Sequence, residues 1–394
     1  MNTILKYKTP AEDFNSALPL GNGHIGAMVY GGTSSERYSV NEATLWSGFP
    51  TCDLENGNPE GFGKVKELML KNRHREATEL LEFEFSGKDT QYYLPLGNIM
   101  IETDCGKPEE YERNLDLSTA IHTVSFKGTA FEVHRESFAS HPHRVMVIKT
   151  KQKGIGITRI SFDSLLSQTV TSEDNLLTVK GVAPYMSQAV TDKPTEAVYS
   201  EKDCEKGMRY TAIIKVETDG RVEAMNGTLH ISDAEDILIF FAVRTSFKDY
   251  KTHPYLEGLP CDDICLKDIE NALKLDYEQL KKSHLADHSA LFSRTNFSIT
   301  SKTDKYTDEM LLEKTDLARF ELLWNMGKYL TIAASREDSQ VMNLQGLWNE
   351  KLYAPWRSNC TININTEMNY MPTCKLGLFE CFRPYTKMVT ELAD

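Results

Sequence analysis

The chain has 394 residues, of which 40% are hydrophobic and 26% are charged, as in an ordinary globular protein large enough for roughly two to three domains. Its formal net charge of −13 argues against a nucleic-acid partner or an anionic membrane surface, because both bind basic faces. A neutral ligand such as a sugar is compatible with this charge.

The N-terminus, MNTILKYKTPAEDF, lacks the apolar core of a signal peptide, and no window of the chain reaches about 18 apolar residues. The eight cysteines are scattered. Cys261 and Cys265 form the only close pair, and no second pair completes a zinc site, which indicates reduced thiols. We therefore expect a cytoplasmic protein without a membrane span, although a protein that had lost a leader would begin in the same way.

Residues 1 to about 250 are predicted to form mainly β-strands, and therefore an antiparallel sandwich. Short runs rich in β-branched and aromatic residues alternate with turn signals such as TDGR and MNGT. The strand runs are IHTVSF, FEVHRESFA, RVMVIKTK, LLTVKGVA, YTAIIKVET and DILIFFAVRTS. One helical insert, residues 63–85, is predicted from its apolar spacing.

Helices are predicted after about residue 260. Residues 261–294 have apolar side chains at helical intervals, which predicts one long helix or two. A further helix is predicted over 308–335, with a face formed by Leu317, Phe320, Trp324, Gly327 and Thr331. An irregular stretch over 339–366 precedes a last helix near residues 381–394.

Two histidine motifs and one glycine motif are only weak signals of a binding site. His284 and His288 have a metal-compatible i, i+4 spacing but lack a third ligand, so we expect packing histidines. The HPH pair at 141–143 has no evident partner. The GNGHIG stretch at 21–26 precedes a strand, not a helix, so it offers no helix N-terminus to a phosphate.

The stretch from Asn343 to Tyr370 combines aromatic rings, amides and one arginine, including Trp348, Trp356 and Arg357. Sugar sites use this combination, because pyranose C–H faces lie on rings while hydroxyl groups need fixed donors and acceptors. The alternative is structural: the rings pack the top of a helical domain and the amides cap backbone.

The Asn-Ile-Asn spacing favours a site. In an extended segment residues two apart share one face, so Asn363 and Asn365 would converge while Ile362 and Ile364 anchor the other face. Two convergent carboxamides hold a water between their carbonyl oxygens. We therefore predict that these amides act on a bound water.

Six blocks of the sequence resemble glycoside hydrolase family 95, the inverting α-L-fucosidases and α-L-galactosidases. They occur in family order over nearly the whole chain. The blocks are NSALPLGNGHIGAMVYGGTSSERYSVNEATLWSG (15–48), YLPLGNIMIE (93–102), YERNLDLSTAIHTVSF (111–126), RESFASHPHRVMVIK (135–149), NMGKYLTIAASREDSQVMNLQGLWNE (325–350) and PWRSNCTININTEMNYMP (355–372).

The resemblance implies a multidomain β-then-α protein. Its parts are an N-terminal antiparallel β-super-sandwich (1–260), a helical linker (261–305) and the beginning of an (α/α)6 barrel (306–394). The implied enzyme is an inverting exo-α-L-glycosidase that acts on a carbohydrate substrate with no cofactor and no metal; its oligomeric state is left open.

By resemblance, Asn363 and Asn365 position the attacking water, and the general-acid glutamate and general-base aspartate lie downstream of residue 394. Residues 1–394 alone are therefore expected to be inactive, because such hydrolysis needs both carboxyl groups. The predicted substrate contacts are Thr361, Trp348, Trp356 and Arg357.

The sequence departs from the family pattern at two positions. Met371 stands where the family usually has tryptophan, and Thr361 stands where typical fucosidases have histidine. The smaller, hydroxyl-bearing Thr361 favours L-galactose, which has one more hydroxyl group than L-fucose. The rival hypotheses are a non-catalytic carbohydrate-binding or structural fragment and a phosphorylase, but no basic cluster near Arg357 supports a phosphate site.

Overall fold

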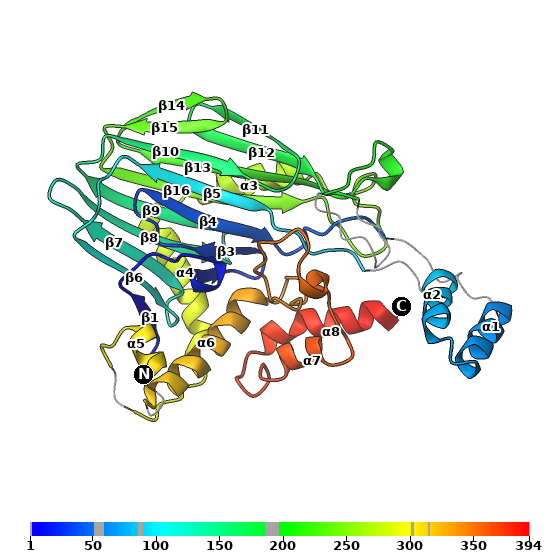
Figure 1. Ribbon diagram of the computed structural model, residues 1–394. Helices are drawn as coiled ribbons and strands as arrows, with labels where there is room; N and C mark the ends of the chain where they lie inside the picture. The colour runs from blue at the N-terminus through cyan, green and yellow to red at the C-terminus, as the bar shows by residue number, and fades with distance from the viewer. Residues whose placement is uncertain are drawn as a thin grey trace.

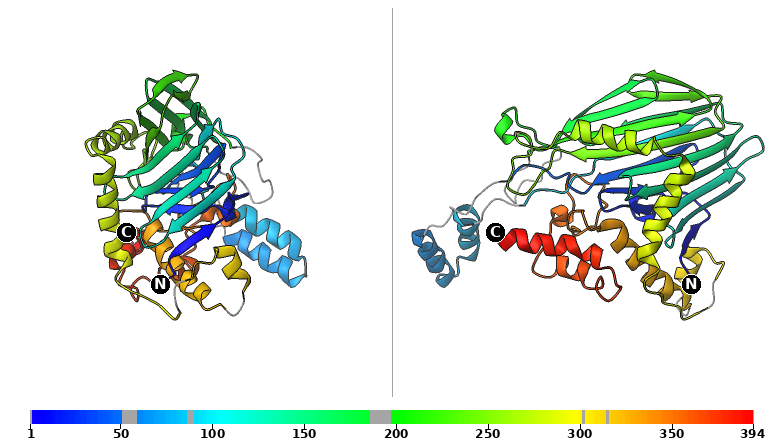
Figure 2. Two further views of the ribbon diagram at one scale, coloured as in Figure 1. Left: turned by 90° about the vertical axis from the view of Figure 1, so that its left-hand side faces the viewer. Right: turned by 180° about the vertical axis from the view of Figure 1, so that it is seen from behind.

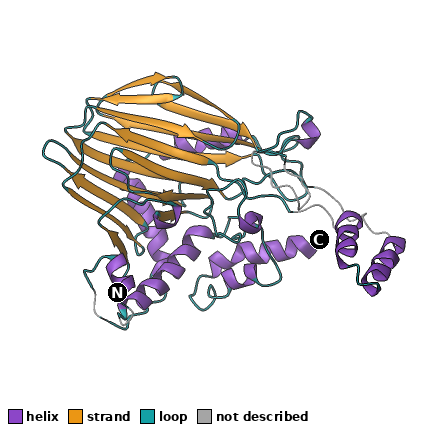
Figure 3. Ribbon diagram, in the orientation of Figure 1, coloured by secondary structure: helices purple, strands orange, loops and turns teal. Residues whose placement is uncertain are grey.

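The structure is a computed structural model that describes residues 2–50, 59–85, 90–185, 197–300, 303–313 and 316–393. Two antiparallel sheets lie face to face, and helices follow them in the chain (Figure 1). The predicted antiparallel sandwich is therefore confirmed, and all six predicted strand runs are strands. Figure 3 shows the sheets as one layered unit with most helices beneath and behind it.

The first sheet has nine strands and the second has seven. The nine-stranded sheet runs in the order β1 (Ile4–Tyr7), β6 (Glu110–Asp116), β7 (Ile121–Lys127), β8 (Glu132–Ser140), β9 (Val145–Lys153), β16 (Asp236–Thr245), β13 (Arg209–Thr218), β12 (Leu176–Val182) and β11 (Gln168–Glu173). The seven-stranded sheet runs in the order β14 (Arg221–Met225), β15 (Thr228–Ser232), β10 (Ile157–Asp163), β5 (Gly97–Thr103), β4 (Ser35–Glu42), β3 (Ile25–Val29) and β2 (Leu18–Gly21).

The two predicted turns join consecutive strands. TDGR connects β13 to β14, and MNGT connects β14 to β15. In the second turn Asn226 and Gly227 both have positive φ, 51° and 75°, as the tight hairpin turns that match strand twist require.

The main hydrophobic core lies between the sheets and continues into the C-terminal segment, where Ile332 of a helix and Trp348 of a loop join it. One ion pair crosses this core. The Arg135 guanidinium on β8 donates to the Glu36 carboxylate on β4 at 2.9 Å, and both side chains are fully buried. Beside it, the Tyr38 and Ser137 hydroxyl groups form a second bond between the sheets, 2.7 Å long.

The predicted helical insert is a pair of helices, α1 (Pro59–Leu70) and α2 (His74–Glu84), that project from one end of the sandwich (Figure 1). The prediction of a single helix is corrected at Asn72, whose φ of 55° is left-handed and breaks the helical path.

Helices α3 (Cys261–Ala272) and α4 (Tyr277–Phe292) cover the outer face of the nine-stranded sheet, as the view from behind in Figure 2 shows. His284 and His288 of α4 are buried, and each ring nitrogen Nε2 lies 2.9 and 2.8 Å from a backbone carbonyl oxygen, of Thr119 and Leu117 respectively. They are packing histidines, as predicted.

The remaining helices are α5 (Thr307–Leu312), α6 (Ala318–Ala334), α7 (Asn365–Tyr370) and α8 (Phe379–Ala393). The predicted face of α6 is wrong at Leu317 and Phe320, which are about half exposed, whereas Thr331 is buried as predicted. Besides its apolar residues, the buried face carries three polar ones, Glu321, Asn325 and Lys328. Among the described residues no helix has the length and hydropathy needed to cross a bilayer.

The helical segment also covers the edges of both sheets. At the β1 edge the Lys6 amide donates to the Thr307 hydroxyl at 2.8 Å, and Asn2 donates to the Glu321 carboxylate, 319 residues later. At the β2 edge the Tyr329 hydroxyl donates to the Pro19 carbonyl at 2.6 Å.

Candidate functional site

The irregular stretch 339–366 follows α6, ends in the first turn of α7 and is fixed to the β-sandwich. The Trp348 indole donates to the Leu20 carbonyl at 2.8 Å and is only 7% exposed. Asn41 and Asn349 form a reciprocal pair, in which the Asn41 amide donates to the Asn349 carbonyl at 2.9 Å and the Asn349 backbone donates back at 3.0 Å. The sandwich therefore sets the position of this loop.

Two of the loop amides serve the backbone. The Asn343 side-chain oxygen accepts bonds from the Gln345 amide and the Ser358 hydroxyl, both 2.8 Å long. The Asn349 side-chain amide donates to the Tyr93 and Lys351 carbonyls, both at 2.8 Å. For these two asparagines the capping alternative is confirmed.

Three consecutive residues, Trp356, Arg357 and Ser358, have φ values of 53°, 57° and 52°. Non-glycine residues in this left-handed region are strained, and such strain concentrates at binding loops. The turn leaves Trp356 80% exposed, while the Arg357 guanidinium lies 5.5 Å from the centre of the Tyr92 ring. The ring of Trp356 is therefore exposed to solvent rather than packed into the core.

The predicted extended segment around Asn363 and Asn365 is wrong. Residues 362–364 form a turn and Asn365 begins α7, because the Thr361 and Ile364 carbonyls accept the Thr366 and Met368 amides. Ile362 and Ile364 are about half exposed and anchor no sheet face.

Both asparagine side chains are exposed, and neither forms a hydrogen bond to any residue that the structure describes. They differ in this from Asn369, whose amide donates to the Asn343 carbonyl at 3.1 Å. The fold therefore leaves these two carboxamides available.

Thr361 is partly buried just before this turn. Its hydroxyl donates to the Asn359 side-chain oxygen, and it lies outside any strand. An intramolecular acceptor thus fixes the hydroxyl proton and leaves the oxygen lone pairs for another donor.

A cavity of about 340 Å³ adjoins this loop, and sequence reasoning did not identify it. Its walls combine aromatic rings with amide, hydroxyl and thiol groups, as sugar sites do. They include Trp46, Phe49, Phe247, Tyr250, Gln340 and Cys360. The LWSG tetrapeptide at 45–48 places the partly buried Trp46 next to the polar Ser47, and this pairing was the signal available in the sequence.

Two titratable groups near the cavity have shifted pKa values. Burial raises the pKa of Glu42 to about 7, against the opposing effect of the bonds that the Thr44 hydroxyl and amide donate to it. Burial also raises the pKa of the Cys360 thiol to about 11, so this cysteine is a neutral wall and not a nucleophile.

The chain matches two protein-family models. Residues 5–250 match the model described as Glycosyl hydrolase family 65, N-terminal domain, and residues 276–394 match the Glycosyl hydrolase family 95 catalytic domain. The second match contains α6, the whole loop and α7. The candidate site therefore lies in a segment similar to a catalytic domain.

Curated relatives match along the chain. It is 29% identical to Alpha-L-fucosidase 2 of Arabidopsis thaliana, over 99% of this chain and 49% of that protein. It is 28% identical to Probable alpha-fucosidase A of Aspergillus niger, over 95% of this chain and 48% of that protein. The chain thus spans about half the length of these relatives.

Among solved structures, the chain is similar to a putative kojibiose phosphorylase from human microbiome. The identity is 10%, the TM-score is 0.49, and the match covers 87% of this chain and 43% of that one.

Proposed function

Because this chain belongs to glycoside hydrolase family 95, we propose that the protein removes terminal α-L-fucosyl or α-L-galactosyl residues from oligo- or polysaccharides, with inversion at the anomeric carbon. The names of the curated relatives support the fucosyl substrate, and Thr361 favours the galactosyl one. The proposal includes the division into a sandwich (1–260), a linker (261–305) and the start of an (α/α)6 barrel (306–394).

One observation carries the proposal: two exposed carboxamides, Asn363 and Asn365, stand at the start of α7 without partners among the described residues. The amide oxygens accept one proton of a water and orient its lone pair toward the anomeric carbon, while the second O–H points to a general-base aspartate. The aspartate takes that second proton as the water attacks, and a general-acid glutamate protonates the leaving oxygen. Inversion needs these carboxyl groups about 6.5–9.5 Å apart, with the water between them.

The sugar binds against the aromatic and cationic groups of the loop. The exposed Trp356 ring offers a stacking face, and Arg357 offers donors to the hydroxyl groups. Trp348 is already committed to the Leu20 carbonyl, so it holds the loop in place. The adjoining cavity accommodates the rest of the glycan.

The first test measures hydrolysis of 4-nitrophenyl α-L-fucoside and α-L-galactoside by the full-length protein. Asn363→Ala and Asn365→Ala should each lower kcat by about 10²-fold or more with little change in KM, because water activation acts mainly in the transition state. Asn271→Ala, an exposed position on α3, is the matched control.

Residues 1–394 alone should release neither sugar. A folded full-length protein that binds fucosides but hydrolyses neither substrate would instead support the non-catalytic carbohydrate-binding alternative. Asparagine variants that lose stability but retain kcat would show that the amides are structural.

The second test concerns the sugar. Thr361→His should shift the ratio of kcat/KM values toward the fucoside, since the larger imidazole fills the space that the extra C6 hydroxyl group of L-galactose needs. A ratio that does not respond to the substitution would remove Thr361 from the specificity argument.

A further inference from the structure

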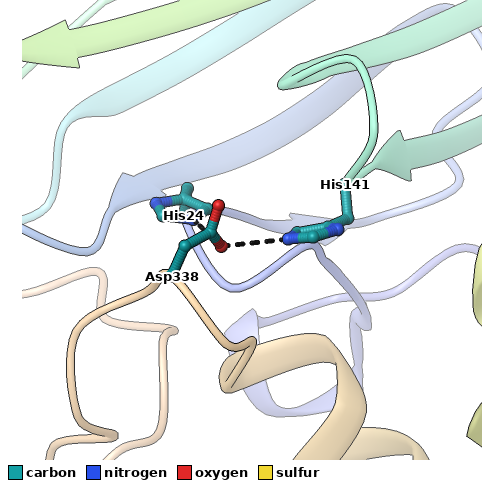
Figure 4. A group of neighbouring side chains, drawn as sticks. All are labelled: His24, His141 and Asp338. Carbon is teal, nitrogen blue, oxygen red and sulfur yellow. Dashed lines mark hydrogen bonds and ion pairs between the residues drawn. The ribbon is translucent and has the colours of Figure 1, made fainter. Parts of the chain in front are cut away.

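Three loops that are distant in sequence bring two histidines and an aspartate together. His24 lies in the turn between β2 and β3, His141 follows β8, and Asp338 follows α6 (Figure 4). The ring nitrogens Nε2 of His24 and His141 lie 3.1 and 3.0 Å from the same oxygen, Oδ1 of Asp338. The three ligand atoms all lie within 4.8 Å of one another. The expectation that His141 has no partner is therefore wrong.

Outer groups hold this cluster in place. The second ring nitrogen of His141, Nδ1, faces Oδ1 of Asp287 on α4 at 3.6 Å. Arg336 clamps Asp287 with two bonds of 2.9 and 2.6 Å. Arg144 pairs with the other carboxylate oxygen of Asp338, Oδ2, and so leaves Oδ1 to the histidines.

The position of His141 between two carboxylates limits what can occupy the cluster. A neutral imidazole carries one N–H, so it can donate to Asp287 or to Asp338 but not to both. If the proton points to Asp287, the Nε2 lone pair faces Asp338 Oδ1, and a cation is needed between them. Metal-binding histidines usually donate their other N–H to a carboxylate in this way.

We propose that His24, His141 and Asp338 bind one divalent transition-metal ion of the zinc class. Two imidazole nitrogens and a carboxylate oxygen are ligands that such ions accept, and further positions stay open to water because the Asp338 side chain is 48% exposed. The N–O separations are close to the ~3.3 Å expected between ligands bonded about 2.0–2.1 Å from a tetrahedral ion.

The ion would join three parts of the molecule. His24 lies in a turn between two strands of the seven-stranded sheet, His141 follows a strand of the nine-stranded sheet, and Asp338 precedes the loop of the candidate site. Its role is thus to fasten the catalytic segment to the sandwich. The site is separate from Asn363 and Asn365, so its test does not depend on the proposed hydrolysis.

The experiment titrates chelator-treated protein with Co²⁺, followed by visible absorption, and with Zn²⁺, followed by thermal unfolding. We expect one equivalent of Co²⁺ to give tetrahedral or five-coordinate bands, and Zn²⁺ to raise Tm. His24→Gln and Asp338→Asn should abolish both responses, and Asp287→Asn should weaken affinity about 10–100-fold by removing the partner of His141. His134→Gln, an exposed histidine on β8, is the control and should respond like the unaltered protein.

Folded protein that gives no cobalt bands and no rise in Tm would overturn the proposal. In that case His141 carries a proton on each ring nitrogen and donates to both Asp287 and Asp338. Binding that survives both His24→Gln and Asp338→Asn would equally overturn it, since the ion would then sit elsewhere.

Discussion

Glu321 shows how a buried carboxylate on α6 is stabilised. Its side chain is fully buried, yet it accepts bonds from the backbone amides of Thr300 and Ile299 and from the backbone and side chain of Asn2. Burial alone raises the pKa of a carboxyl group, but these donors outweigh it and lower the pKa of Glu321 to about 2. The charged form is therefore the stable one in the folded protein.

This shift predicts an acid-sensitive contribution to stability. Because the folded-state pKa lies below the unfolded value of about 4.3, the contribution is complete above that pH and is lost as the pH falls toward 2. Its size is on the order of 3 kcal/mol. Urea unfolding of Glu321→Gln at pH 7, 5 and 3 should show a deficit that shrinks at pH 3. A deficit independent of pH would contradict this account, and Glu223→Gln on exposed β14 is the control.

The same helix shows why residue-level prediction failed in part. An apolar periodicity search passes over Glu321, Asn325 and Lys328, although α6 buries these three residues together with its apolar ones. The hydrogen bonds of Lys328 go to distant groups, the Phe292 and Thr295 carbonyls, and its ammonium lies over the Phe292 ring. Such partners appear only after the chain has folded.

At the scale of single elements, the attachment of the 339–366 loop decides the site geometry. Trp348→Phe keeps an aromatic ring, although a smaller one, and removes the donor to the buried Leu20 carbonyl. We expect a loss of about 1–3 kcal/mol in unfolding free energy, the usual penalty for an unsatisfied buried group.

Chemical denaturation of this variant, together with limited proteolysis of the loop, is the measurement. Trp356→Phe at an 80% exposed position should change stability by about 0.5 kcal/mol or less. Equal losses in both variants would mean that the Trp348 bond does not hold the loop.

Elements with a local signal were predictable from the sequence, and those set by distant contacts were not. The strands could be predicted from alternating apolar and polar residues and from turn sequences such as Asn226-Gly227. Both signals depend only on residues close together in the sequence. The turn at 362–364 resembles a strand because Ile and Thr favour strands. No strand pairs with it, so its backbone bonds are satisfied by the start of α7 instead. Asn363 and Asn365 were identified as site candidates from their residue types, but their relative orientation was not.

At the scale of the whole molecule, the Arg135–Glu36 pair joins the two sheets through their shared core. Removing one partner leaves an unpaired buried charge, so Arg135→Met should lower the unfolding free energy by about 3–5 kcal/mol. Adding Glu36→Gln should recover part of this loss, because the amide keeps an acceptor for the Gly31 amide without the charge.

Equilibrium unfolding of the single and double variants tests the pair. A double variant as unstable as the sum of the two single variants would show that the charges are not coupled. Lys127→Met, which removes the exposed Lys127–Glu110 pair, should change stability little.

The contacts that close the β1 edge have a consequence for synthesis on the ribosome. The Lys6 amide of this edge strand finds its acceptor, the Thr307 hydroxyl, only 301 residues later. At about 5–20 residues per second, the partner emerges roughly 15–60 s after the strand itself. Throughout that interval the nascent sheet presents an open edge of the kind that pairs with other chains. Chaperones that shield nascent strands would therefore act on this protein before its C-terminal helical segment exists.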